Sequence, residues 1–445
     1  MKCNFSVFSR LIRMSGKICI GITFLCAEFA SGQADVPVPS PPQKQPVYLT
    51  NATIHVGDGR VLQRATIGFD KGKIIFLEEN PTFKTDETIG RVIDCSGKHI
   101  YPGLIAPNTI IGLSEIEAVR ATNDYRETGQ YNPNARSIIS YNTDSRVTPT
   151  IRSNGVLYAQ VVPQGGVISG TSSVVQLDAW NWEDALVKED GIWLNWPSEL
   201  SGGGWWAEPA ALHANKEYHK QVEAIKSYFK EAKSYCAAAE HTKTNLRFEA
   251  MCDLFNKRKN LYVNATRVNE MQHAILLGEE MGMRIVLCGA DESWKIAGEL
   301  ARKGIPVILG ETHDLPGMPD DDIDIAYKTP YLLQQAGVLF CISIPGAFWQ
   351  QRNLMFQAGT AAAYGLSKED ALRAITLNAA KILGIDNHTG SLEKGKAATL
   401  IVSTGDLLDM RTSHIELAFI DGREIDLNNK QKELYEKFKR KYGLQ

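Results

Sequence analysis

The sequence has little of several features that identify particular classes of protein. Its 48 basic and 51 acidic residues nearly cancel, so no excess of positive charge is available for a nucleic-acid partner. The eight cysteines form no Cys-x-x-Cys pair, and neither a Gly-x-Ser-x-Gly elbow nor a His-Glu-x-x-His motif occurs. These absences argue against a zinc knuckle, an α/β-hydrolase serine nucleophile and the common metalloprotease helix.

The first 34 residues have the pattern of a secretory signal. Basic residues precede the apolar run 18–25, and small residues follow from Ala30 to Ala34. The run is too short to span a bilayer comfortably, so we expect cleavage near Ala34 and an exported protein, periplasmic or extracellular, with no integral membrane span. Cys26 suggests a lipoprotein instead, but the preceding Thr-Phe-Leu lacks the small residues of such a site. A Pro-rich lead-in over 35–46 follows.

Removal of the signal leaves an odd number of widely spaced cysteines. This pattern indicates no disulfide framework, and buried free thiols are the expected state. The five that remain are Cys95, Cys236, Cys252, Cys288 and Cys341.

Residues 47–104 and 389–427 are predicted to form one small β-sandwich domain from the two ends of the chain. In the first segment, apolar runs at 65–69 and 73–76 flank a Gly-containing turn, which is typical of a β-hairpin. In the second, residues 398–402 and 415–420 are apolar runs of strand length. Because two all-β segments bracket the rest of the chain, we expect them to pair with each other.

Residues 105–388 alternate between apolar strands and amphipathic helices. Strand-like runs begin at Val156, Leu261, Arg284, Pro306 and Val338, and helical periodicity covers 268–281, 294–302 and 330–336. Apolar strands that alternate with helices indicate parallel packing. More than five such units in a segment of this length predict the α/β fold class, with a (β/α)8 TIM-type barrel, for which roughly 250 residues are typical.

Two further segments are predicted to be helical. Residues 216–259 are highly charged and contain an apolar stripe at helical spacing. This pattern predicts a helical insertion on the surface of the barrel. Residues 428–445 are basic, and Leu434, Phe438 and Tyr442 share one stripe. For this tail we expect a helix docked on the body of the protein rather than a membrane anchor. The stripe of the insertion consists of Tyr218, Val222, Ile225, Phe229 and Ala232.

Several segments carry a resemblance to a known family. They include Pro-Gly-Leu-Ile at 102–105, Thr-Leu-Asn-Ala-Ala at 376–380 and Gly-Ser-Leu-Glu-Lys-Gly-Lys-Ala-Ala-Thr-Leu at 390–400. With these segments the chain resembles the amidohydrolase superfamily, and most closely its exported imidazolonepropionase-like members, over nearly all of the mature chain. The resemblance implies a (β/α)8 barrel, a small β domain built from both chain ends, and a zinc site at the carboxyl ends of the strands.

The resemblance also implies which residues would hold the metal, and here the chain departs from the family. The paired histidines of the first strand correspond to Asn108 and Ile110, and the later histidines to Asn264 and Gly289. The aspartate after the eighth strand corresponds to Ser343. Without a metal no bound water is activated, and without the aspartate the general base is missing. The sequence therefore does not support the standard metal-dependent mechanism.

A relocated site remains as a hypothesis. Asp291 follows the sixth strand, and Glu311 and His313 follow the seventh, so all three are expected at the rim of the barrel. They are weak candidates for a displaced metal or for an acid–base pair. The alternative is an ordinary polar rim loop, which the lack of regular ligand spacing favours.

Two functions stay open at this point. The chain is by resemblance a hydrolase of non-peptide C–N bonds of the cyclic amide type. Alternatively, it is a catalytically inactive barrel that binds a small molecule, or that pairs with an active relative or with copies of itself. The sequence itself predicts no cofactor: zinc is what the resemblance implies, and a relocated metal is the hypothesis given above.

Overall fold

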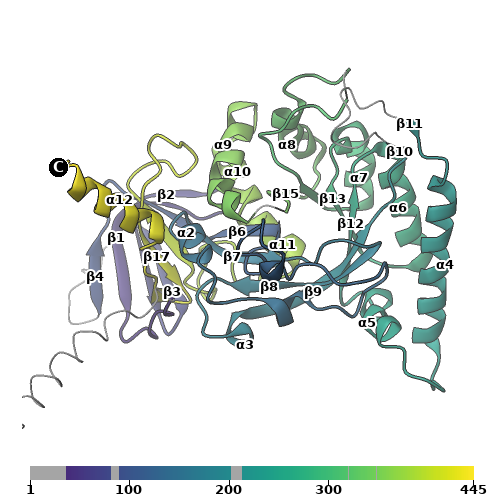
Figure 1. Ribbon diagram of the computed structural model, residues 1–445. Helices are drawn as coiled ribbons and strands as arrows, with labels where there is room; N and C mark the ends of the chain where they lie inside the picture. Colours follow the sequence, from purple (N-terminus) through teal and green to yellow (C-terminus); the bar gives the residue numbers. More distant parts are fainter. Residues whose placement is uncertain (1–36, 82–89, 202–212, 319, 347, 445) are drawn as a thin grey trace, which may run out of the picture. The chain divides into compact units, whose positions relative to one another are not determined.

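Two sheets organise the part of the chain that the computed structural model describes, residues 37–81, 90–201, 213–318, 320–346 and 348–444 (Figure 1). The chain divides into two compact units, residues 1–38 and 39–445, and the elements below belong to the second. The predicted signal sequence lies outside the described residues, as do residues 35 and 36 of the predicted lead-in.

The first sheet is the predicted barrel. Its eight strands follow one another in space in the order of the chain, and most of their residues are buried. The apolar runs that predicted buried strands lie in β7, β12, β13, β14 and β15, so the α/β barrel is confirmed. The strands are β6 (Leu104–Thr109), β7 (Val156–Val161), β8 (Ile168–Gln176), β9 (Leu186–Asn195), β12 (Asn260–Ala265), β13 (Ile285–Gly289), β14 (Val307–Leu309) and β15 (Phe340–Ile342).

Strand β8 departs from the parallel arrangement that we expected. It pairs antiparallel with both β7 and β9, whereas the other neighbouring strands are parallel. Only residues 162–167 connect β7 to β8, and a parallel return needs a crossover of a dozen or more residues. The short connection therefore sets the direction of β8, and its first residue, Ile168, lies beside Leu194 near the carboxyl end of β9.

Helices close the gap between the two outer strands of this sheet. Among the described strands, β6 and β15 are the ends of the pairing order. The Ile105 amide of β6 donates to the carbonyl oxygen of Ile375, which lies between α10 and α11, at 3.0 Å. The Asn378 side chain of α11 donates to the carbonyl oxygen of Phe340 in β15 at 2.9 Å. One helical segment thus contacts both edges, and the barrel is nearly closed.

Helices flank the barrel strands (Figure 1). Helix α6 has the predicted bounds, whereas α8 begins five residues before the predicted stretch and contains Pro330. The stripe predicted for the charged insertion is the buried face of α4. The helices are α2 (Thr148–Arg152), α3 (Trp182–Ala185), α4 (Tyr218–Ala237), α5 (Leu246–Phe255), α6 (Val268–Met281), α7 (Ala297–Lys303), α8 (Ile325–Ala336), α9 (Leu354–Ala363), α10 (Lys368–Ala374), α11 (Leu377–Leu383) and α12 (Lys430–Lys441).

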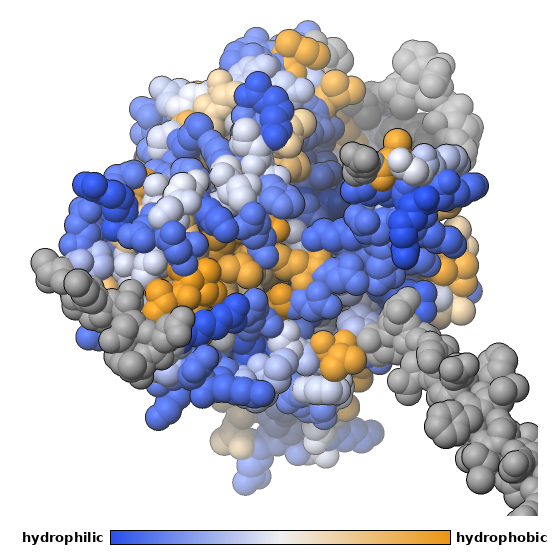
Figure 2. Space-filling view, turned by 90° about the vertical axis from the view of Figure 1, so that its left-hand side faces the viewer, coloured by the Kyte–Doolittle hydropathy of each residue, from blue (hydrophilic) through white to orange (hydrophobic). Residues whose placement is uncertain are grey.

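The second sheet is the β domain, and it contains strands from both ends of the chain, as predicted. Strand β5 pairs antiparallel with β16, which joins the two segments, and β2 and β3 form the predicted hairpin. Figure 2 shows hydrophobic residues gathered in the middle of one face of the molecule, with hydrophilic residues around them. The strands are β1 (Val47–His55), β2 (Val61–Asp70), β3 (Lys73–Glu79), β4 (Arg91–Asp94), β5 (His99–Pro102), β16 (Leu400–Ser403), β17 (Ile415–Ile420) and β18 (Arg423–Glu424); the short pair β10 (Leu200–Ser201) and β11 (His213–Ala214) stands apart.

A buried ion cluster joins the β domain to the barrel. The carboxylate of Asp178, which follows β8, accepts hydrogen bonds from Arg152 of α2 and, at 2.7 Å, from Arg423 of β18. It also accepts the amide of Ser40 at 3.0 Å. The side chains of Asp178 and Arg152 are 1% and 5% exposed, so both charges depend on this pairing.

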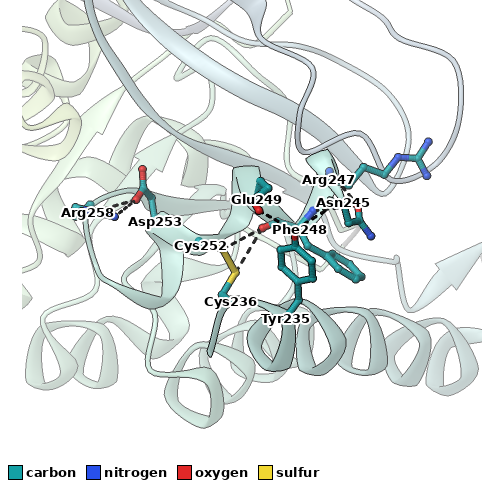
Figure 3. Close-up of a disulfide and its surroundings, with 9 residues drawn as sticks. All are labelled: Tyr235, Cys236, Asn245, Arg247, Phe248, Glu249, Cys252, Asp253 and Arg258. Carbon is teal, nitrogen blue, oxygen red and sulfur yellow. Dashed lines mark hydrogen bonds and ion pairs between the residues drawn. A yellow bond between two sulfur atoms is a disulfide. The ribbon is translucent and has the colours of Figure 1, made fainter. Parts of the chain in front are cut away.

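The expectation that all cysteines are free thiols is wrong for one pair. Cys236 of α4 and Cys252 of α5 form a disulfide with a Cα–Cα distance of 5.3 Å. Figure 3 shows the bond between the two helices, with Tyr235 beside it donating its hydroxyl proton to Glu249 at 2.6 Å. The two helices form a hairpin, and this brings together cysteines that are 16 positions apart. Cys95, Cys288 and Cys341 are buried and free, as predicted.

Loss of this disulfide should lower stability measurably. We expect the Cys236→Ser/Cys252→Ser protein to lose about 3 kcal/mol of unfolding free energy, because the bond closes a loop of roughly 15 residues in the unfolded chain. Urea unfolding measures the difference. A reductant should destabilise the wild type and leave the double variant unchanged; equal stability of the two proteins would contradict this prediction.

The predicted tail helix is present as α12. Hydrogen bonds of Asn429 and Gln431 attach its start to the body, whereas none of the residues 430–441 is fully buried. The helix therefore contacts the body at its start and is largely exposed along the rest of its length. No described helix has the length and apolar character needed to cross a membrane.

Candidate functional site

The positions that the resemblance assigns to the family's metal ligands lie at the carboxyl ends of the barrel strands. Asn264 of β12 and Gly289 of β13 are neighbours, because a Cβ on Gly289 would lie 3.2 Å from Asn264 Oδ1. The amide of Asn264 also donates to Asn195 Oδ1 of β9, at 3.4 Å. Two neutral amides and a glycine therefore meet at this part of the rim.

The first strand contributes no ligand either. Asn108 has a left-handed backbone (φ +55°) at a register shift between β6 and β7, and it is buried. Its backbone N–H donates to Gln160 Oε1 at 3.1 Å. Ile110, two residues later, is 6% exposed and belongs to the apolar core. The strand end is therefore occupied by packing and backbone hydrogen bonding.

Ser343 is the last of the five positions that the resemblance assigns to metal binding or catalysis. Its side chain is fully buried, and its hydroxyl donates to the carbonyl oxygen of Leu309 at the end of β14, at 2.7 Å. Zinc in proteins takes imidazole, thiolate and carboxylate donors. Ile110 and Gly289 have no donor side chain, and the two asparagines are neutral, weak ligands. The residues at these five positions do not fit a zinc ion.

A cavity of about 310 Å³ opens beside these residues, at the ends of β12, β13 and β14. Gly289 lines it, together with Asp291 and Glu311, which the sequence placed at the rim. Asp314, which follows the same strand as Glu311 and was likewise expected at the rim, also lines it. Arg267 lines the cavity too, and sequence reasoning missed it, although it follows the end of β12 by two residues.

The charges in this cavity are unbalanced. Asp291, Glu311 and Asp314 have no ion-pair partner among the described side chains. Glu292, by contrast, pairs with Lys295 at 2.9 Å. Burial, and then the neighbouring charge of Asp314, raise the pKa of Asp291 and of Glu311 above the usual range of a carboxyl group. The cavity therefore favours a ligand that carries positive charge.

His313 does not join these carboxylates. Its Nε2 lies 2.6 Å from Thr360 Oγ1 of α9, and its backbone N–H donates to Gln357 Oε1 at 2.9 Å. Burial lowers the pKa of the imidazole, which favours its neutral form. Within the described ranges, no three His, Cys, Asp or Glu side chains are arranged to hold a metal ion. The geometry brings Asp291 and Glu311 to one cavity and leaves His313 outside it.

Below the rim, the barrel encloses a buried carboxylate that sequence reasoning also missed. Asp190 of β9 accepts hydrogen bonds from Gln160 of β7 at 2.6 Å, Ser172 of β8 at 2.7 Å and Tyr262 of β12 at 2.6 Å. Burial raises the pKa of Asp190, although these hydrogen bonds act in the opposite direction. Because Gln160 also accepts the backbone N–H of Asn108, the network supports the end of β6 at Asn108.

Comparison with known proteins agrees with this geometry. A model described as the amidohydrolase family matches residues 318–426, and a search of curated proteins finds no match. A solved amidohydrolase from Thermotoga maritima MSB8 is 25% identical, with a TM-score of 0.74, over 85% of this chain and 99% of that chain.

Two more distant structures share the fold. One is a putative prolidase from Bifidobacterium longum, which is 17% identical with a TM-score of 0.50, over 89% of this chain and 100% of that one. The other is a molinate hydrolase, which is 13% identical with a TM-score of 0.52, over 86% and 95%. The family match over residues 318–426, the Thermotoga structure and the shared barrel show that this chain is similar to proteins of the amidohydrolase superfamily.

Proposed function

We propose that this protein is a small-molecule-binding member of its superfamily that has lost metal-dependent hydrolysis. The observation that carries the proposal is the contrast at the rim of the barrel. The five ligand positions supply no set of metal donors, while a cavity of about 310 Å³ adjoins Gly289. A cavity of this size is within the range of ligand sites in proteins, and the carboxyl ends of barrel strands are where such sites lie.

The unpaired carboxylates indicate what the ligand carries. A carboxylate that lines a cavity without a cationic partner is partly desolvated, and a ligand ammonium or guanidinium group would offset the cost of that desolvation. Apolar contacts come from Leu309, Met318 and Ile325, and backbone at Gly310 and Gly317 lies open to a polar group. We therefore expect a small amide-like or cyclic compound with one cationic substituent.

Binding of a matched pair of probes tests this function. We expect N-acetyl-lysinamide to bind more tightly than the isosteric, neutral N-acetyl-norleucinamide, as measured by isothermal titration calorimetry. Asp291→Asn and Glu311→Gln should each weaken the binding of the cationic probe about ten-fold or more, since hydrogen bonds to charged groups contribute about 1.5–3 kcal/mol.

The control is Glu223→Gln, because Glu223 is a surface carboxylate on α4 that does not line the cavity, with its side chain 71% exposed. This change should leave both affinities as they are. Equal binding of the two probes, or no binding of either, would contradict the proposed ligand class.

A second function, hydrolysis of a C–N bond without a metal, has one observation in its favour. Asp291 and Glu311 line one cavity, and the pKa of each is raised, which is a property of general acids. This function predicts turnover of cyclic amides that persists in a chelator and is abolished by Asp291→Asn. Binding without turnover favours the first function.

We also propose that the protein works in an oxidising compartment, as the predicted secretory signal suggests. The Cys236–Cys252 disulfide supports this, because such bonds persist mainly in exported proteins. Cell fractionation of the natural host tests it, and recovery of the protein from the cytoplasm with both thiols reduced would contradict it.

A further inference from the structure

Helix α12 turns its apolar side chains toward solvent. Leu434 is 41% exposed, Phe438 45%, Tyr435 63% and Tyr442, which follows the helix, 66%. Lys439 is less exposed than the apolar residues of the helix. A surface helix ordinarily directs its apolar stripe at the core and its charged residues at water, so the orientation of α12 is the reverse of the usual one.

The four apolar residues form a single stripe. With 3.6 residues per turn, positions 434, 435, 438 and 442 fall within an arc of about 100°. Phe438 and Tyr442 stack with their ring centroids 6.4 Å apart, and the Lys441 ammonium lies 5.8 Å and 5.1 Å from the two rings. The stripe is therefore continuous along the last turns of the helix.

Lysines flank this stripe on both sides. The same helical geometry places Lys430, Lys437 and Lys441 along one border and Lys432 and Lys439 along the other. Glu433 and Glu436 fall on the opposite side of the helix, away from the stripe, together with Arg440. The result is an apolar surface with five lysines at its margins and both acidic residues behind it.

The helix is attached to the body at its beginning. The Asn429 side-chain amide donates to Ser153 Oγ at 2.8 Å, and Thr150 Oγ1 donates to Gln431 Oε1 at 2.7 Å. Asn429 Oδ1 in turn accepts the amide of Lys432 at 2.9 Å and caps the helix. These bonds hold the start of α12, while the side chains of the stripe remain 41–66% exposed.

We propose that α12 binds an anionic lipid surface, with its axis in the plane of that surface. Aromatic and leucine side chains would insert between lipid chains, and the lysines on both borders would extend to the phosphate groups. The sign of the border charges is what selects this partner, because a neutral apolar groove would gain nothing from five lysines. This inference is independent of the ligand proposed for the barrel.

Vesicle co-sedimentation with the mature protein tests the proposal. We expect binding to vesicles of phosphatidylglycerol and phosphatidylcholine, and little binding to vesicles of phosphatidylcholine alone. Leu434→Ser/Phe438→Ser should abolish binding, and Lys437→Glu/Lys441→Glu should weaken it more than ten-fold, since each lysine near an anionic membrane contributes roughly a five-fold factor. Raising the salt to 1 M should weaken the wild type as well, because screening shortens to about 3 Å.

Matched controls separate this role from a change in folding. Leu276→Ser alters an apolar residue of α6 that is 48% exposed, and Lys230→Glu alters a surface lysine of α4. Both should leave vesicle binding unchanged, and circular dichroism should be the same for all variants. Equal binding to neutral and anionic vesicles would overturn the proposal. A second result would also overturn it: the wild type does not bind vesicles but forms a dimer in sedimentation velocity, and Leu434→Ser/Phe438→Ser dissociates that dimer. The stripe would then be a protein interface.

Discussion

Replacement of Asp178 by alanine should lower the free energy of unfolding by about 3–5 kcal/mol, because it leaves buried guanidinium groups without their counter-charge. Asp178 is 1% exposed and bonds to Arg152 on the barrel side and to Arg423 on the β-domain side. Removal of this one carboxylate weakens the attachment of the β domain to the barrel. Urea unfolding followed by circular dichroism measures the loss.

The matched control is Asp144→Ala, since Asp144 is exposed and has no ion-pair partner among the described residues. Its effect should stay within about 0.5 kcal/mol. A loss of less than 1 kcal/mol for Asp178→Ala would mean that the ion cluster does not hold the two parts together.

Asp190→Ala should cost about 4 kcal/mol, the second large effect that we expect. The change leaves the buried donors of Gln160, Ser172 and Tyr262 without their acceptor, and each unsatisfied donor costs about 1–3 kcal/mol. Ser172→Ala removes one donor and keeps the acceptor, so it should cost about 1 kcal/mol. Denaturant midpoints of the three proteins test the order.

The pH dependence of the wild type follows from the same residue. Because burial raises the pKa of Asp190 in the folded state above that of an ordinary aspartate, folding favours the protonated carboxyl. This contribution is complete below the unfolded pKa and is lost as the pH rises through the folded pKa. Asp190→Asn cannot titrate, so the wild type should lose stability relative to this variant between pH 4 and neutrality. A relative gain over that range would contradict the sign of the shift.

Much of the barrel could be predicted because buried parallel strands appear in the sequence as runs of apolar residues. The start of β13 and the bounds of α6 follow directly from such periodicity. The direction of β8 was missed, although the six residues between β7 and β8 are too few for a parallel crossover. The Cys236–Cys252 bond was missed because cysteine spacing does not reveal a helical hairpin.

The site could be predicted only in part, for a related reason. Residues directly after a strand must lie at the rim, so Asp291 and Glu311 were found. Which way a rim side chain turns depends on helices far along the chain, and His313 turns to Thr360 of α9. The Asp190 network links strands β7, β8, β9 and β12. A local sequence pattern cannot predict that side chains from four strands meet at one carboxylate.

The central claim, that the rim cavity binds its ligand without a metal, is tested most directly by calorimetry on zinc-treated protein. Mature protein is incubated with Zn²⁺, passed through gel filtration, analysed for metal, and titrated with N-acetyl-lysinamide with and without EDTA. We predict well under one zinc per chain and the same Kd in both titrations. One tightly held zinc per chain, together with loss of ligand binding in EDTA, would contradict the account.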